Sequence, residues 1–320
     1  MSTTQGTSIV LWRLLFHPLV RFPGPRLAAA TSLYRTYHEV IRGGEFLNEL
    51  HRLHTIYGSV LHFNDPRAYN DVYSLKHRCK KDPSFYTCFG VNQSTFGTVA
   101  TREAKERRNI LSPLFSRRSV TDAEDEIQKH VEKLIERLDL SEGPCGLFLG
   151  FRCATLDMIP SFCFGKGFGA MESEGFACPL LMTIQASTPL LFLIKSFPWI
   201  PRVLSFSPYF VSSCFPWHID LQPTVRQQIK DLVDFATETP AVADEGRMPC
   251  VYHHPLSMHQ SSVFLDVGQS LLEEALSLLQ AGSDTVGNTC TVGAFHVLHN
   301  PTTHRKPVQE LLAVTLDRAT

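Results

Sequence analysis

The sequence lacks an excess of charge of either sign. Lysine and arginine together number 30, aspartate and glutamate number 31, and the formal net charge of the 320 residues is −1. A protein that binds nucleic acid through its overall electrostatic field needs a large positive excess. The composition therefore predicts no nucleic-acid partner, and any function that depends on charge must be local.

The sequence also lacks paired cysteines. Its nine cysteines are scattered singly, and no Cys-x-x-Cys pair occurs. A disulfide framework or a structural zinc site would need paired spacings. We therefore expect reduced thiols in an intracellular or cytosol-facing protein, and the spacings predict no metal ligand.

The N-terminus lacks an apolar run long enough to cross a membrane. Residues 8–20 are apolar but contain Arg13 and His17, and they fall short of the roughly 20 residues that a membrane-spanning helix needs. The prolines and glycine of residues 22–25 then end any helix. We interpret residues 1–21 as the remnant of an apolar anchor that contacts a membrane peripherally, and residues 22–320 as the body of the protein.

Strand signals are sparse, and helical periodicity dominates the chain. Residues 60–63 are the clearest strand candidate, whereas an apolar residue recurs every three or four positions in several longer segments. The sequence predicts a mainly α fold with a small, incomplete β region. It predicts helices at these ranges: 46–57, 66–75, 102–115, 119–138, 147–164, 176–195, 220–236 and about 264–299. Residues 76–101 are predicted to form a long, functional loop.

The longest predicted helix contains an unusual polar turn. Residues 281–285, Ala-Gly-Ser-Asp-Thr, interrupt an otherwise apolar run. Glycine costs about 1 kcal/mol relative to alanine in a helix interior, and a buried aspartate needs a partner. An opened turn with a hydroxyl and a carboxyl beside a cavity can hold water and relay protons. A helix bend around a buried polar network is the alternative interpretation.

In combination with three other segments, this turn resembles the cytochrome P450 monooxygenases, and among them most closely the fungal members. The central helix of that family carries Ala/Gly-Gly-x-Asp/Glu-Thr. In the same order along the chain, residues 22–25 resemble the hinge after the membrane anchor, residues 107–116 the arginine-bearing helix under the heme, and residues 157–165 the family's Asp…Cys-Phe-Gly stretch. The resemblance covers nearly all of residues 10–316.

The resemblance implies a heme cofactor and assigns site residues. Asp284 and Thr285 would deliver protons for cleavage of the oxygen–oxygen bond. Gly282 would leave room for dioxygen on the iron, and Ala281 would lie with it at the heme. Arg108 would neutralise a heme propionate, because a guanidinium can pair bidentately with a carboxylate. Without the resemblance, Arg108 and its charged neighbours are typical of a solvated helix face.

The iron ligand of this family is not expected within residues 1–320. The family holds its iron through a cysteine thiolate in a glycine-rich loop near the C-terminus. Cys290 is the one cysteine after Thr285, and it lies inside the predicted long helix without a Phe-x-x-Gly context. The Glu-x-x-Arg pair of the family is also expected beyond residue 320. We therefore expect a P450-like domain truncated before the heme-thiolate segment.

The resemblance also implies a function and partners. A completed protein would insert one oxygen atom from dioxygen into a lipophilic molecule, a terpenoid or polyketide of secondary metabolism, with electrons from an NADPH-dependent reductase. It would work at the cytosolic face of the endoplasmic reticulum membrane, or in the cytoplasm because the anchor is incomplete. We predict that this chain alone is inactive, and the alternative is a non-catalytic helical remnant. Aromatic residues within 85–96 and 192–206 could line the substrate pocket or belong to the core.

Overall fold

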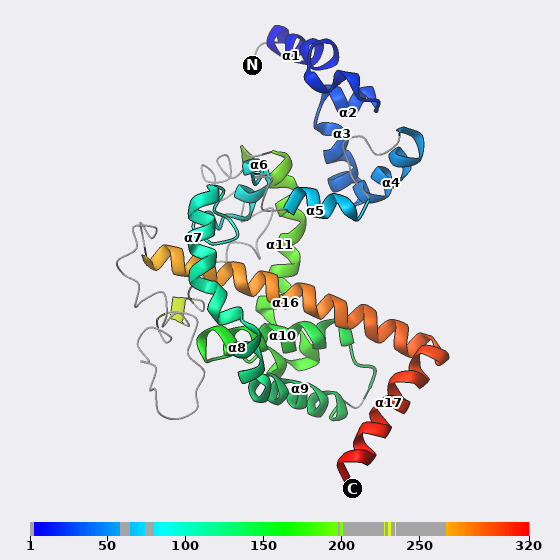
Figure 1. Ribbon diagram of the computed structural model, residues 1–320, viewed down its shortest axis with the longest axis vertical. Coiled ribbons are helices and arrows are strands. Elements are labelled where there is room, and N and C mark those ends of the chain that lie inside the picture. Colours follow the sequence, from blue (N-terminus) through cyan, green and yellow to red (C-terminus); the bar gives the residue numbers. More distant parts are fainter. Residues whose placement is uncertain are drawn as a thin grey trace. The chain divides into compact units, whose positions relative to one another are not determined.

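The computed structural model is mainly helical wherever it describes the chain (Figure 1). The described residues are 3–57, 65–73, 80–141, 143–197, 199–200, 227, 230, 231, 234 and 267–319, and these residues contain no strand. The prediction of a mainly α fold is therefore confirmed. The strand predicted at 60–63 lies outside the described residues, as does nearly all of the helix predicted at 220–236.

The chain divides into two compact units, and each is described by itself. The first contains Met1–Gly90, Val99–Thr101 and Ala186–Cys214. The second contains Val91–Thr98, Arg102–Gln185 and Phe215–Thr320. The predicted boundary between an anchor at 1–21 and a body at 22–320 stays a prediction.

The first unit is a series of short helices. They are α1 (Thr3–Leu15), η1 (Pro18–Arg21), α2 (Arg26–Ala30), α3 (Leu33–Thr36), the π-helix η2 (Tyr37–Ile41), α4 (Phe46–Tyr57), α5 (Arg67–Tyr73), α6 (Pro83–Tyr86) and η3 (Thr87–Phe89). Pro18 and Pro25 each precede or begin a new helix, because proline lacks a backbone donor but suits the first helical turn. The loop predicted at 76–101 was wrong in part, since α6 and η3 form within it.

The second unit contains the longer helices. They are α7 (Thr101–Leu111), η4 (Ser112–Phe115), α8 (Arg117–Asp122), α9 (Glu124–Asp139), α10 (Leu147–Phe164), η5 (Ala170–Glu172), η6 (Glu174–Phe176), α11 (Pro179–Ser196), α16 (Val267–His299) and α17 (Pro301–Ala319). The C-terminal part of α11, from Ala186 onward, belongs to the first unit. The helix predicted at 119–138 is therefore two helices, which meet at the buried Ala123. Ser116 caps the first of them by accepting the Ser119 amide hydrogen.

The core of the second unit lies where α10 packs along α16, with α9 also packed on α10 (Figure 1). The sequence predicted α16 well, because its apolar period continues until Asn300. The Asn300 side chain then caps α17 by accepting the Thr302 amide hydrogen. The buried residues of this core include Leu134, Cys153, Leu156, Cys163, Phe164, Met171, Phe176, Leu181, Leu271, Ala275 and Leu279. Two helices in the described part of the chain, Leu147–Phe164 and Glu174–Ser196, have the length and apolar character to cross a membrane, but the first is mostly buried in this core.

The family-like Asp…Cys-Phe-Gly stretch has a structural role here. Asp157 is 2% exposed, and its two carboxylate oxygens accept hydrogen bonds from the backbone amides of Ala170 and Met171 at 2.7 and 2.9 Å. Gly165 ends α10 in the left-handed region at φ +78°, where glycine carries no steric penalty. The carboxylate therefore fixes η5 against α10.

The close approach of α10 to α16 can be tested at two glycines of α16. A Cβ atom on Gly287 would lie 2.7 Å from Arg152 Cγ and 3.1 Å from Arg152 Cα, whereas one on Gly293 would meet nothing within 4 Å. We expect Gly287→Ala to lower the free energy of unfolding by about 1–3 kcal/mol, because the backbone of α10 cannot yield easily. Gly293→Ala should raise it by about 0.5–1 kcal/mol through helix propensity.

Urea unfolding followed by circular dichroism measures both changes. Gly293→Ala is the matched control, since it makes the same substitution on the same helix without a facing backbone. Equal stabilisation by the two alanines would show that α10 does not approach α16 this closely.

Candidate functional site

The predicted polar turn lies in the middle of α16. Residues 281–285 are helical, so the prediction of an opened turn was wrong. The Thr285 hydroxyl donates to the Ala281 carbonyl at 2.8 Å, and the Ser283 hydroxyl donates to the Leu279 carbonyl at 2.7 Å. Both bonds run from a hydroxyl to the carbonyl four residues earlier, so they are made within the helix.

The turn presents different residues to its two sides. Ala281 and Thr285 are exposed, whereas Ser283 is 1% exposed. Since residues four apart share one side of a helix, Ala281 and Thr285 form one exposed side of α16. The opposite side, with Ser283 and Gly287, faces α10, where the hydroxyl of Thr155 donates to the Ser283 carbonyl at 2.8 Å.

The space beside Gly282 is filled by a side chain. A Cβ atom on this glycine would lie 2.5 Å from Ile159 Cγ1 and 2.6 Å from Ile159 Cδ1. The glycine therefore allows α10 to pack closely, which is a reason for its presence that the sequence argument did not consider. Its assignment as room for dioxygen stays a prediction.

Asp284 has a partner that sequence reasoning missed. The Arg152 Nε atom donates to Asp284 Oδ1 at 2.9 Å, and the side chains are 5% and 57% exposed, respectively. The guanidinium carbon of Arg152 also lies 3.8 Å from the centre of the Phe148 ring. A signal for this pair existed, because an arginine within the apolar run 147–164 must find an acceptor.

Arg107 and Arg108 occupy different environments. Arg108, the predicted propionate ligand, is exposed, and within the described residues its guanidinium forms no ion pair. Arg107 is 6% exposed and donates from Nη1 to Ser270 Oγ on α16 at 2.7 Å. Burial lowers the pKa of Arg107, and the carboxylates of Glu274, Glu103 and Glu273 raise it in part.

The irregular segment Val91–Thr98 is tied to the start of α16 by buried carboxylates. Glu273 Oε2 accepts the Gln93 amide at 2.6 Å, and Glu274 Oε2 accepts the Thr95 amide at 2.7 Å. Ser270 Oγ donates to the Gln93 carbonyl at 2.9 Å. Sequence reasoning also missed Glu273 and Glu274, although two adjacent acids inside an apolar helix indicate buried acceptors.

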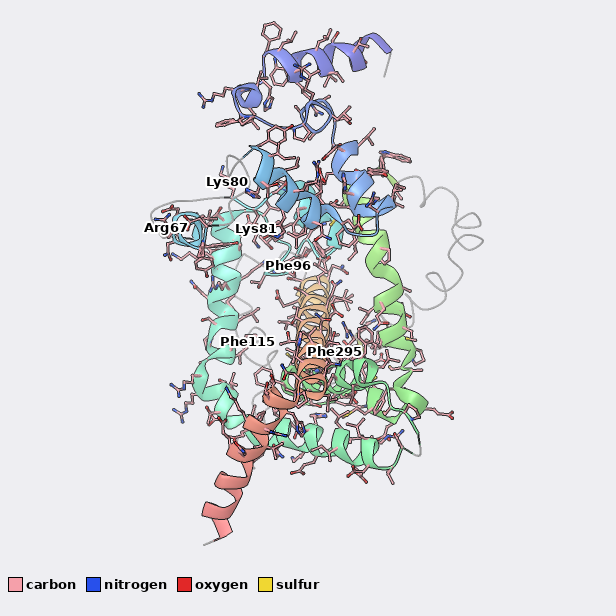
Figure 2. All side chains as sticks on the ribbon, turned by 90° about the vertical axis from the view of Figure 1, so that its right-hand side faces the viewer. Arg67, Lys80, Lys81, Phe96, Phe115 and Phe295 are labelled. Atoms are coloured by element: carbon pink, nitrogen blue, oxygen red, sulfur yellow. The ribbon has the colours of Figure 1, made fainter. Side chains whose placement is uncertain are left out.

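The aromatic side chains named as pocket candidates lie in both units. Phe96, labelled in Figure 2, belongs to the segment Val91–Thr98, and its side chain is 38% exposed. Phe85 and Phe192 lie in the first unit, where each ring faces the ammonium group of Lys195. Phe206 lies outside the described residues. Their assignment to a substrate pocket or to the core stays a prediction.

Comparisons with known proteins cover most of the chain. The family model described as cytochrome P450 matches residues 40–320. Conidiogenone synthase PchP450 of Penicillium rubens is 32% identical over 319 residues, which are 95% of this chain and 63% of that protein. Tryptophan 6-hydroxylase fscE of Fusarium equiseti is 31% identical over 310 residues, 92% of this chain and 60% of that protein. Cytochrome P450 monooxygenase MO6277 of Ascocoryne sarcoides is 28% identical over 333 residues, 98% of this chain and 65% of that protein. The chain thus spans less than two thirds of the length of these relatives.

Proposed function

Because this chain belongs to the cytochrome P450 family, we propose that it is the helical part of a monooxygenase that oxidises a lipophilic secondary metabolite with dioxygen. The family's fungal members to which it is similar differ in what their names say they act on or make, a conidiogenone in one and tryptophan in another. A terpenoid or polyketide substrate is the proposal that the apolar aromatic residues support. The observation that carries the proposal is the exposed side of α16 formed by Ala281 and Thr285.

Two features of the described residues support a heme site. Arg108 offers an exposed guanidinium that can pair with a propionate carboxylate. Ala281 and Thr285 expose small side chains, which a flat macrocycle can approach closely. When bound, heme would supply the activation of dioxygen that protein side chains cannot perform alone.

The hydroxyl of Thr285 and the carboxylate of Asp284 would handle protons. Since Thr285 Oγ1 donates its hydrogen to the Ala281 carbonyl, its oxygen lone pairs are available to accept a hydrogen bond from water. Asp284 is 57% exposed, and its Oδ1 atom accepts a hydrogen bond from Arg152. These two groups are the proposed proton relay.

Partners and location follow from the same proposal. An NADPH-dependent reductase would supply electrons. The exposed apolar side chains Leu11, Trp12, Leu15 and Phe16, in and just after α1, support peripheral contact with the cytosolic face of the endoplasmic reticulum membrane. We propose residues 1–21 as this anchor and residues 22–320 as the P450-like domain.

We also propose that residues 1–320 alone do not provide an iron thiolate, in which case this chain by itself is a non-catalytic helical remnant. Cys290 follows Asp284 and Thr285 but lies exposed on α16, between Thr289 and Thr291. A cysteine inside a regular helix lacks the loop of backbone amide donors that stabilises a ligating sulfur. Its thiol is therefore a poor candidate for the axial ligand.

Spectroscopy of the heme-reconstituted chain tests this directly. We expect the reduced, carbon monoxide-bound protein to lack the red-shifted absorption of a thiolate-ligated heme. The Cys290→Ala variant is the control and should give the same spectrum as the wild type. A red-shifted band in the wild type would contradict the proposal, and its loss in Cys290→Ala would identify the ligand.

A further inference from the structure

In the part of the chain that the structure describes, three contacts from one side of α10 hold the polar turn of α16. Arg152 binds Asp284, Thr155 donates to the Ser283 carbonyl, and Ile159 fills the space beside Gly282. These three residues of α10 are spaced by three and four, so they share a helix side. The orientation of the turn is therefore determined by α10.

Arg152 is itself held rigidly. Its side chain is 5% exposed, its guanidinium lies over the Phe148 ring, and its Nη1 atom donates to the Phe148 carbonyl at 3.4 Å. Its backbone and Cγ atom pack against Gly287, where any side chain would collide. An arginine fixed in this way presents its Nε–H group in one direction only.

Asp284 lies at a border on the surface of α16. With about 100° of rotation per residue, its Cα–Cβ direction is about 80° from the middle of the exposed side formed by Ala281 and Thr285. It is also about 80° from the middle of the side formed by Ser283 and Gly287, which faces α10. The backbone therefore allows the carboxylate to turn toward the exposed side or toward α10. The hydrogen bond from Arg152 selects the orientation toward α10.

We infer that Arg152 is a positioning residue for Asp284, which holds the carboxylate against α10 so that α16 presents Ala281 and Thr285 on its exposed side. The inference rests on the proposed function, since it assigns Asp284 a defined orientation beside the proposed proton relay. It adds a residue of α10 to a site otherwise built from α16. The order of events it implies is that Thr285 meets a ligand on the exposed side, and Asp284 reaches that side only when its bond to Arg152 opens.

Four variants of the full 320-residue chain test this inference without heme or turnover. They are Arg152→Gln, which removes the charge, Arg152→Lys, which keeps it, Asp284→Asn, and the double variant Arg152→Gln/Asp284→Asn. Arg117→Gln is the control, because it removes an exposed arginine of the same unit. The readouts are hydrogen exchange of the α16 amides and the carbon resonance of the Asp284 carboxyl group, assigned by its loss in Asp284→Asn.

We expect Arg152→Gln and Asp284→Asn each to speed exchange around residues 284–288 by about fivefold, with no further increase in the double variant. Arg152→Gln should also move the Asp284 carboxyl resonance, and Arg152→Lys should restore much of both signals. Arg117→Gln should change neither signal. An unchanged Asp284 resonance in Arg152→Gln, or additive effects in the double variant, would overturn the inference. Neither result depends on the carbon monoxide spectrum, so this inference and the proposed function can fail separately.

Discussion

Replacing Arg107 with methionine is expected to lower the free energy of unfolding by roughly 3–5 kcal/mol, whereas the same replacement of the adjacent Arg108 should change it by less than about 0.5 kcal/mol. The two arginines are neighbours in α7, but only Arg107 is buried. Its removal would leave the buried carboxylates of Glu273 and Glu274 without the cation that balances them. The loss of a cation beside buried acids costs more than the loss of an exposed one.

Chemical denaturation of the three proteins under identical conditions measures this difference. Arg108→Met is the matched control, because it removes the same chemical group one residue away. Arg107→Met should also expose the segment Val91–Thr98 to proteolysis, since Ser270 holds both Arg107 and the Gln93 carbonyl. Equal effects of the two substitutions would mean that Arg107 is not buried against α16. The same two substitutions separate the roles of the two arginines. Arg108 is proposed to contact heme, so its loss should leave the fold intact.

The helical framework could be predicted because it follows from local patterns. The apolar period of α16 and the cap at Asn300 fix a helix whose observed range, Val267–His299, differs from the prediction by a few residues. The helices predicted at 147–164 and 176–195 are also observed, as α10 and α11. Periodicity shows which side of a helix is buried, and this is sufficient to locate the helix.

The contacts of the candidate site could not be predicted in the same way. Arg152 and Asp284 are 132 positions apart, and the sequence pattern does not say which buried groups will meet. An opened, oxygen-holding turn needs an empty space beside Gly282, but Ile159 occupies that space. The family membership therefore rests on the match along residues 40–320 rather than on the geometry of this turn. A glycine in a buried helix can border an open space, or it can let a neighbouring helix pack closely. Only a structure distinguishes these two cases.

Replacing Asp157 with alanine is expected to lower the free energy of unfolding by about 3–5 kcal/mol. Hydrogen bonds to charged groups contribute about 1.5–3 kcal/mol each, and Asp157 accepts two from the amides of Ala170 and Met171. Both of these residues are essentially buried, at 1% and 0% exposed, so water cannot replace the lost acceptor. Asp157→Asn keeps one acceptor oxygen but turns an amide group toward the second N–H group, and it should lose about half as much.

Thermal and urea unfolding measure these losses, with Asp139→Ala as the control for removing an exposed aspartate from a helix of the same unit. The control should stay within about 0.5 kcal/mol of the wild type.

Replacing Asp157 should also affect the candidate site. Asp157 lies between Thr155 and Ile159 on α10, and these two residues hold the turn of α16. If Asp157→Ala frees η5, α10 loses part of its support, and hydrogen exchange of the α16 amides near Asp284 should rise with it. Wild-type stability in Asp157→Ala would show that the two amide hydrogen bonds do not form, and a loss of stability without faster exchange at Asp284 would show that α10 holds the turn independently of η5.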